Sequence, residues 1–153
     1  MKKLIITCVI LLVSIGSLYS QNKTIKGRAI TENLENLPFA SILIKDTIEV
    51  GKTDANGYFQ INIPISEQKI IFAFLGLEIT NVKLIDKCNE VEVILMDDVT
   101  YDFMSLKKVD RHRKKRFKKL IKLHKEAFEK GIFKTANPCY TQEFMPYYEK
   151  NQK

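Results

Sequence analysis

Histidine is scarce in this sequence of 153 residues, and the first hundred residues contain none. The only two, His112 and His124, both lie among lysines and arginines, whose positive charge opposes the binding of a metal ion or a proton. A catalytic zinc site of the kind built from two histidines and a glutamate needs imidazole ligands beside an open coordination position. The sequence therefore predicts no metal ligands, and we interpret His124 as a packed or snorkelling helix residue.

Motifs for other kinds of catalysis are lacking too. Residues 51–53 read Gly-Lys-Thr, like the end of a phosphate-binding loop, but Asp46 stands where that motif requires its earlier glycine. Neither Cys88 nor Cys139 has a histidine nearby in the sequence to activate it as a nucleophile. We therefore predict that the protein is not an enzyme, with no catalytic residues and no cofactor.

Long hydrophobic runs are absent after the first twenty residues. The chain begins with Lys2 and Lys3, continues with an apolar run over residues 4–13, and reaches Ser20 through small and polar residues. This order is typical of a secretory signal peptide, and we predict cleavage after Ser20 and export. A membrane anchor is the alternative, but the run is shorter than the roughly 18 to 20 residues of a spanning helix. No later segment could span a bilayer.

Cysteine is rare as well, with three residues in the chain. Cys8 leaves with the predicted signal peptide, so Cys88 and Cys139 remain in a protein expected to mature where disulfides form. These two permit one intramolecular bridge, but nothing in the local sequence indicates that they meet. A disulfide between them and two free thiols both stay open.

Charge is distributed unevenly along the chain. Residues 21–104 contain 8 Lys and Arg against 13 Asp and Glu, a net of −5, whereas residues 105–134 contain 13 against 3, a net of +10. Such asymmetry indicates a boundary between two parts of different character. We therefore divide the mature chain into a domain over residues 21–100 and a basic extension with a tail over residues 101–153.

Short apolar runs separated by turn residues fill the first part. In residues 58–63 and 90–95 every second side chain is apolar, with mainly polar side chains between them, the period of a strand with one buried face. Seven strands are expected in all, over residues 24–30, 40–44, 49–53, 58–63, 70–75, 78–84 and 90–95. This spacing predicts a mainly β fold, a seven-stranded antiparallel sandwich with Greek-key connections.

The stretch "KTDANGYFQINIP" joins two of these strands. Asp54, Asn56 and Gly57 lie between residues 49–53 and 58–63, and asparagine and glycine tolerate the positive φ angles of hairpin turns. A calcium loop is the alternative, but Gly57 is fourth from Asp54 and Ile65 is twelfth, where an EF-hand needs glycine sixth and glutamate last. We predict a turn.

Three segments in order carry a family resemblance: "IKGRAITENLENLPFASILIKDT", "VGKTDANGYFQINIP" and "KIIFAFLGLEITNVKL". Together they resemble the carboxypeptidase-like regulatory domain over about residues 24–96. The resemblance implies a prealbumin-like (transthyretin-like) sandwich without catalysis of its own, found beside catalytic domains of metallocarboxypeptidases and in outer-membrane receptors. The chain departs from the pattern at residues 33–36, which replace a glycine-bearing turn, at Phe39 and at Leu77.

The pattern changes at about residue 110. Apolar side chains and His124 recur there at spacings of three and four, which predicts an amphipathic helix over residues 110–130. Asp110 is the predicted N-cap and Gly131 the predicted C′ residue. The apolar face comprises Phe117, Leu120, Ile121, His124, Ala127 and Phe128. It could dock on the sandwich, on a second copy or on a membrane. The tail 135–153 is expected to pack against the sandwich.

The basic face of this helix is the candidate interaction surface, with Arg111, Arg113, Lys114, Lys115, Lys118, Lys122 and Lys125. A merely solvated face, attachment to anionic lipid, and contact with an acidic protein or polysaccharide remain open. Nucleic acid would satisfy the charge equally well, but export makes that partner unsuitable.

These observations favour a non-catalytic module of the cell envelope, in the periplasm or at the outer-membrane periphery of a Gram-negative bacterium. Its partner would be an envelope protein or an anionic membrane surface. One alternative is an accessory or regulatory subunit of a separately encoded peptidase or outer-membrane receptor. Another is a carbohydrate-binding module that uses surface aromatics such as Tyr58, although fold alone cannot assign a ligand.

Overall fold

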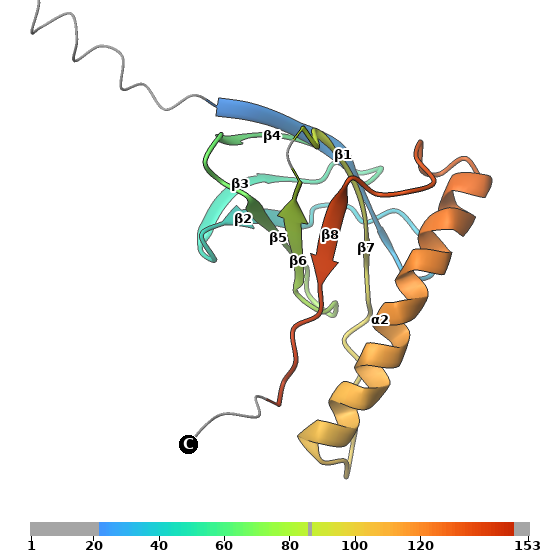
Figure 1. The fold of residues 1–153 in the computed structure, drawn as a ribbon. Helices are drawn as coiled ribbons and strands as arrows, with labels where there is room; N and C mark the ends of the chain where they lie inside the picture. The colour runs from blue at the N-terminus through green and yellow to red at the C-terminus, as the bar shows by residue number, and fades with distance from the viewer. Residues whose placement is uncertain (1–21, 86, 149–153) are drawn as a thin grey trace, which may run out of the picture.

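The computed structural model describes residues 22–85 and 87–148. The predicted signal peptide, residues 1–20, lies outside the described residues. Within these described residues, eight strands and one helix follow one another in the order shown in Figure 1: β1 (Asn22–Thr31), β2 (Ser41–Ile44), β3 (Ile48–Lys52), β4 (Tyr58–Pro64), β5 (Lys69–Ala73), β6 (Thr80–Leu84), β7 (Glu90–Leu95), α2 (Leu106–Glu129) and β8 (Tyr140–Glu143).

The strands form two sheets that pack face to face. The smaller sheet has the order β4-β1-β7 and the larger one the order β3-β2-β5-β6-β8. Strand β1 pairs antiparallel with β4 but parallel with β7. The mainly β architecture is therefore confirmed and each of the seven predicted strands is present. The expectation of a wholly antiparallel arrangement is wrong, because β1 and β7 run in the same direction. The tail adds an eighth strand to the seven predicted, and the Greek-key connections stay a prediction.

Gly27 allows β1 and β7 to approach closely. It lies opposite Val91 in the parallel pairing, where a Cβ atom on residue 27 would stand 1.8 Å from the Val91 carbonyl oxygen. A side chain there would force the two strands apart. The glycine is therefore required by the close approach of the backbones, a common reason for glycine within a strand.

The predicted turn between β3 and β4 is confirmed. The Asp54 carboxylate accepts hydrogen bonds from the backbone N–H groups of Asn56 (2.8 Å) and Tyr58 (2.9 Å). Gly57 has a φ angle of 80°, in the left-handed region, and a Cβ atom there would lie 2.4 Å from the Ala29 carbonyl oxygen. The carboxylate is thus occupied by its own turn, as in other Asx turns, and this loop connects strands.

The main core lies between the two sheets and comes from alternate residues of facing strands. Strand β4 buries Phe59, Ile61 and Ile63 and exposes the side chains that alternate with them, as its pattern predicts. Phe59 of β4 contacts Phe72 of β5 edge to face, with 5.3 Å between ring centroids. Burial of each large aliphatic side chain contributes about 1.5–3 kcal/mol, so this core dominates the stability of the sandwich.

A second, smaller core attaches α2 to the outer face of the small sheet. Ile30 of β1 and Ile94 of β7 point away from the main core and pack with Leu120, Ala127 and Phe133. Strand β7 is consequently buried on both faces, although its sequence alternates as though one face met water. The helix runs beside β7 in Figure 1, so the basic extension is an integral part of the fold.

The tail returns across the molecule and adds β8 to the edge of the large sheet. Strand β8 pairs antiparallel with β6, with Asn81 opposite Glu143 and Leu84 opposite Tyr140. The expectation that the tail packs against the sandwich is confirmed for the part that is described, and its form is a paired strand. An edge strand that would otherwise present unpaired backbone groups is thereby covered.

Candidate functional site

Helix α2 begins four residues earlier than predicted. Ser105, and not Asp110, occupies the N-cap position, and its side chain makes no capping hydrogen bond. The end of the helix agrees with the prediction, because Gly131 has a φ angle of 71° and donates to the Phe128 carbonyl oxygen. Ile132 donates to the Ala127 carbonyl oxygen, which completes a Schellman motif. Val109 lies four residues before Arg113 and eight before Phe117. This helical spacing already indicates in the sequence that the buried face of the helix begins at Val109 or earlier.

Asp110 anchors the tail instead of capping the helix. Its carboxylate accepts hydrogen bonds from the backbone N–H groups of Tyr147 (2.9 Å) and Tyr148 (2.8 Å), and from Arg113 (3.0 Å). Burial would raise the pKa of this carboxyl group, but the two N–H donors and the guanidinium lower it overall. The side chain thus stays ionised and ties the segment after β8 to the first turns of α2.

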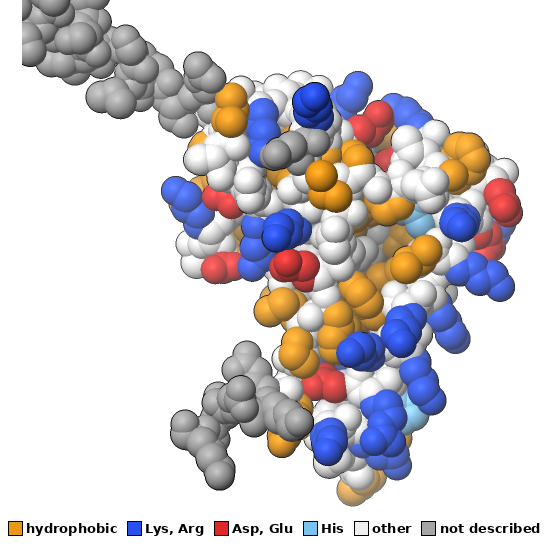
Figure 2. Space-filling view, in the orientation of Figure 1, with side chains coloured by type: hydrophobic (Ala, Val, Ile, Leu, Met, Phe, Trp, Pro, Cys, Tyr) orange, Lys and Arg blue, Asp and Glu red, His pale blue; other side chains and the backbone are white. Residues whose placement is uncertain are grey.

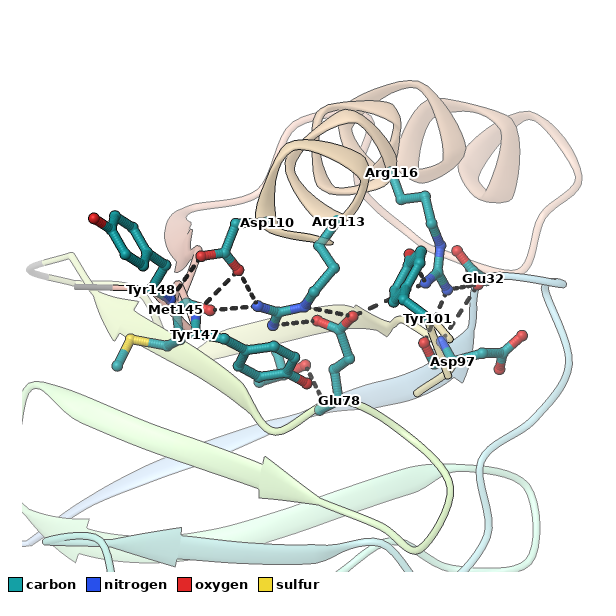
Figure 3. A network of polar contacts seen from close by, with 11 residues as sticks. Glu32, Glu78, Asp97, Tyr101, Asp110, Arg113, Arg116, Met145, Tyr147 and Tyr148 are labelled. Carbon is teal, nitrogen blue, oxygen red and sulfur yellow. Dashed lines mark hydrogen bonds and ion pairs between the residues drawn. The ribbon is translucent and has the colours of Figure 1, made fainter. Parts of the chain in front are cut away.

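Arg113 is the centre of a buried polar network (Figure 3). Its guanidinium donates to both carboxylate oxygens of Glu78, at 3.0 and 2.8 Å, and to the Met145 carbonyl oxygen at 2.9 Å. The ring of Tyr147 covers the guanidinium, with its centroid 3.5 Å from Cζ. Arg113 is 3% exposed and Glu78 is 6% exposed. Arg113 therefore does not belong to the accessible basic face, and that part of the sequence prediction is wrong.

Arg116 makes a second connection to the sandwich. It donates to the Glu32 carboxylate, to the Asp97 carbonyl oxygen at 2.9 Å and to the Tyr101 hydroxyl at 3.4 Å. The pKa of Arg116 rises above its usual value because these acceptors outweigh its burial. The pKa of the Asp97 carboxyl group is raised by burial and by the nearby charge of Glu32. Two of the cations of the basic segment thus serve as structural anchors.

The other cations of the helix itself lie on its accessible face. Arg111, Lys114, Lys115, Lys118, Lys122 and Lys125 are exposed, as predicted from their positions on the helical wheel. Lys107, Lys108 and Lys119 are exposed as well and were not singled out from the sequence. Figure 2 shows Lys and Arg side chains along the length of the helix. We call the nine residues named here the basic face.

Apolar side chains are exposed at the start of α2, next to the basic face. Phe103 is fully exposed, Leu106 is 55% exposed and Met104 is 37% exposed. We call these three residues the apolar tip. Tyr147 and Tyr148 are about half-exposed beside it, since Asp110 holds their backbone at the same end of the helix. Figure 1 shows that this end of α2 projects beyond the two sheets.

The predicted apolar face of the helix divides in the structure. Leu120, His124 and Ala127 are buried against the sandwich, whereas Ile121 is 71% exposed and Phe128 is 42% exposed. Ile121 and Phe128 therefore do not share the docking of this face on the sandwich. The buried stripe of α2 is narrower than the predicted apolar face and includes Val109 and Arg113 as well.

Cys88 and Cys139 form a disulfide, with 5.4 Å between their Cα atoms. Cys88 precedes β7, and Cys139 immediately precedes β8. The loop after α2 is held by further contacts: Lys134 and Thr135 donate their backbone N–H groups to the buried carboxylate of Glu92, at 2.7 and 3.0 Å. These contacts fix the position from which β8 starts.

The two histidines differ in their burial and in their contacts. His112 is partly buried near Tyr101, with 6.1 Å between ring centroids. His124 is 4% exposed and packs against Phe133, and neither of its ring nitrogens has a hydrogen-bond partner among residues 22–85 and 87–148. The backbone groups of Glu92 and Ala136 lie near enough to the ring to raise its pKa, but neither makes a hydrogen bond of regular geometry with it. Burial lowers the pKa of His124, against the opposing effect of the Glu92 charge from β7.

Acid is expected to destabilise the fold through His124. The folded state disfavours protonation of this ring, whereas the unfolded chain takes up the proton near the ordinary pKa of 6.5. Stability should therefore be unaffected by His124 above that pH and fall as the pH drops below it, by at most about 1.4 kcal/mol per pH unit. This pH dependence is checked by urea unfolding of the wild type and of His124→Phe, each at pH 7.5 and at about pH 5. The free energies of unfolding of the two proteins should differ by an amount that changes with pH. A difference that is the same at both pH values would contradict the role of His124.

Among the described residues, no cluster of three or more His, Cys, Asp or Glu side chains is placed to hold a metal ion. No helix within that part of the chain is both long enough and apolar enough to cross a membrane. Tyr58, the aromatic of the carbohydrate alternative, has the Arg28 guanidinium 4.7 Å from its ring centroid. One face of this ring is thus covered by a cation, which leaves it less suited to stacking on a sugar.

The fold and the contacts define a β-sandwich to which a basic helix is anchored by the buried Arg113–Glu78 ion pair and the partly buried Arg116–Glu32 ion pair. Compared with known protein families, residues 25–102 match the CarboxypepD_reg-like domain. The chain belongs to this family, as the three sequence segments indicated. The match ends before α2 and β8. Neither the curated proteins nor the solved structures gave a match.

Proposed function

We propose that this protein is an exported, non-catalytic module of the cell envelope that attaches peripherally to an anionic membrane surface. The observation that carries the proposal is the conjunction of the basic face with the apolar tip at the projecting end of α2. Lys and Arg near an anionic bilayer contribute about 1 kcal/mol each. Exposed Phe, Leu and Met side chains enter the boundary between headgroups and acyl chains, and tyrosines favour the same depth.

Three features support this assignment. The buried stripe of α2 is occupied by the small sheet, so the helix is held rigidly with its cations outward. Arg113 and Arg116 are neutralised by carboxylates inside the molecule, which leaves the surface charge to the basic face. The disulfide is consistent with an oxidising compartment outside the cytoplasm, where the amino-terminal segment would direct the chain.

Membrane attachment predicts co-sedimentation with phosphatidylglycerol-containing vesicles that weakens as salt is added. Replacing Arg111, Lys114 and Lys115 by glutamine should lower the partition coefficient about 100-fold, given roughly 1 kcal/mol for each cation. The matched control replaces Lys26, Lys45 and Lys83 by glutamine. These residues are exposed on the sandwich, and their replacement should change the partition coefficient little. The measurement uses the mature chain, with phosphatidylcholine vesicles as the uncharged reference.

Other outcomes would favour the alternatives. If the protein ignores anionic vesicles but a protein of envelope extracts binds it stoichiometrically, it is an accessory subunit of a peptidase or receptor, and the membrane proposal fails. Binding that both triple variants lose equally would indicate attraction to net charge without use of the basic face, and would also overturn the proposal.

A further inference from the structure

A groove of about 270 Å³ separates α2 from the edge formed by β8. Ile94, Leu120 and Tyr140 form its buried floor, Phe117 and Pro138 line its sides, and the exposed Thr141 stands on β8 at its border. Figure 2 shows hydrophobic side chains gathered in the hollow between the helix and the body of the molecule. Lys118 of the basic face also lines the groove, whereas the apolar tip and the cations replaced in the vesicle test lie outside its lining.

One polar side chain in the lining is buried and lacks a partner. Tyr140 donates its hydroxyl to the Glu92 carbonyl oxygen, and Gln142 donates to the Ile94 carbonyl oxygen at 3.0 Å. His124, by contrast, leaves both ring nitrogens unpaired among the described residues. A buried polar group without a hydrogen bond costs about 1–3 kcal/mol. A ligand that supplied the missing bond would recover part of that cost.

The chemistry of His124 selects the kind of group that it can bind. A neutral imidazole has one N–H donor and one bare nitrogen acceptor. The carboxylate of Glu92 acts on this ring from β7, so an anion at the inner end of the groove would be repelled. A hydroxyl group is neutral and can either donate to the bare nitrogen or accept from the N–H.

The size of the groove selects the rest of the molecule. Its volume is nearly twice the roughly 150 Å³ of a dry apolar cavity that takes up benzene. Phe117 and His124 are two helical turns apart, about 10 Å along the axis, so the groove is elongated. We propose that it binds a small neutral molecule with an apolar body and one hydroxyl group, of the class and size of an alkylphenol, whose hydroxyl meets His124.

Para-propylphenol is the probe, with propylbenzene and para-propylbenzoate as matched molecules that lack the hydroxyl or carry a charge in its place. Titration of the whole mature protein, followed by nitrogen-15 NMR of the histidine rings, should show saturable shifts of His124 with the phenol, while His112 serves as the internal reference. The phenol should bind about three- to tenfold more tightly than propylbenzene, the net effect of one hydrogen bond. The benzoate should bind more weakly than the phenol.

Two variants distinguish binding in this groove from nonspecific hydrophobic binding elsewhere on the surface. Thr141→Trp places a large ring at the exposed border of the groove and should weaken phenol binding at least tenfold. Thr47→Trp makes the same change at an exposed turn of the sandwich and should leave binding unchanged. His124→Phe should remove the preference for the phenol over propylbenzene. Absence of saturable binding, equal binding of phenol and propylbenzene to the wild type, or indifference to Thr141→Trp would each overturn the proposal. None of these results bears on vesicle binding.

Discussion

Replacing Arg113 with methionine is expected to lower the free energy of unfolding by about 3–5 kcal/mol, the usual consequence of removing one partner of a buried ion pair. Glu78, at 6% exposure, would lose the guanidinium that now donates to both of its oxygens. Asp110 and the Met145 carbonyl oxygen would each lose a donor as well. Urea unfolding followed by circular dichroism measures the change.

Lys115→Met is the matched control for that substitution. It makes a similar change two residues further on, where the side chain is exposed, and should alter stability by no more than about 0.5 kcal/mol. The double variant Glu78→Leu/Arg113→Met removes both charges and should recover much of the loss, because the cost arises mainly from a buried carboxylate left with only Arg116, at 3.9 Å, as a cationic partner. If Arg113→Met and Lys115→Met were equally stable, the buried pair would not hold α2 to the sandwich.

Removing the disulfide by the double substitution Cys88→Ser/Cys139→Ser should cost about 4 kcal/mol. The bridge closes a loop over a sequence separation of 51 residues, and a loop of that length gives roughly this value in the chain-entropy treatment of the unfolded state. That loop contains β7 and α2 and ends directly before β8. Hydrogen exchange should therefore show β8 losing protection first.

A thiol reductant supplies the control for the disulfide. It should lower the unfolding midpoint of the wild type to that of the double serine variant and leave the variant itself unchanged. Mass spectrometry of thiol labelling under unfolding conditions counts the free thiols in each sample. Equal midpoints for the oxidised wild type and the variant would show that contacts of the loop, such as those of Glu92 with Lys134 and Thr135, hold β8 without the bridge.

Elements whose signal is local were predictable from the sequence. The alternation of Phe59, Ile61 and Ile63 predicted β4, because the two faces of a strand between water and a core must differ. Asn56 and Gly57 marked the turn before it, since few residue types accept the required φ angles. Gly131 marked the end of α2 for the same reason. The order of these signals also carried the family resemblance.

Properties that depend on distant neighbours were not predictable. Arg113 lies four residues from both Val109 and Phe117, so helical spacing puts it on the buried side and Lys114 outside it. What the local sequence does not contain is the partner that compensates the buried charge, because Glu78 lies 35 residues earlier and meets Arg113 only once α2 lies on the small sheet. The parallel pairing of β1 with β7 and the addition of β8 to β6 are likewise contacts between distant segments.

By itself, the sequence determined where the strands and the basic helix form, that the first part belongs with the carboxypeptidase-like regulatory domains, and that positive charge is concentrated on one segment. Only the tertiary structure decided which cations remain accessible, whether Cys88 and Cys139 meet, and that His124 faces an apolar groove without a partner. The physical reason is that periodicity and turn chemistry act over a few residues, whereas burial and pairing depend on segments that folding brings together.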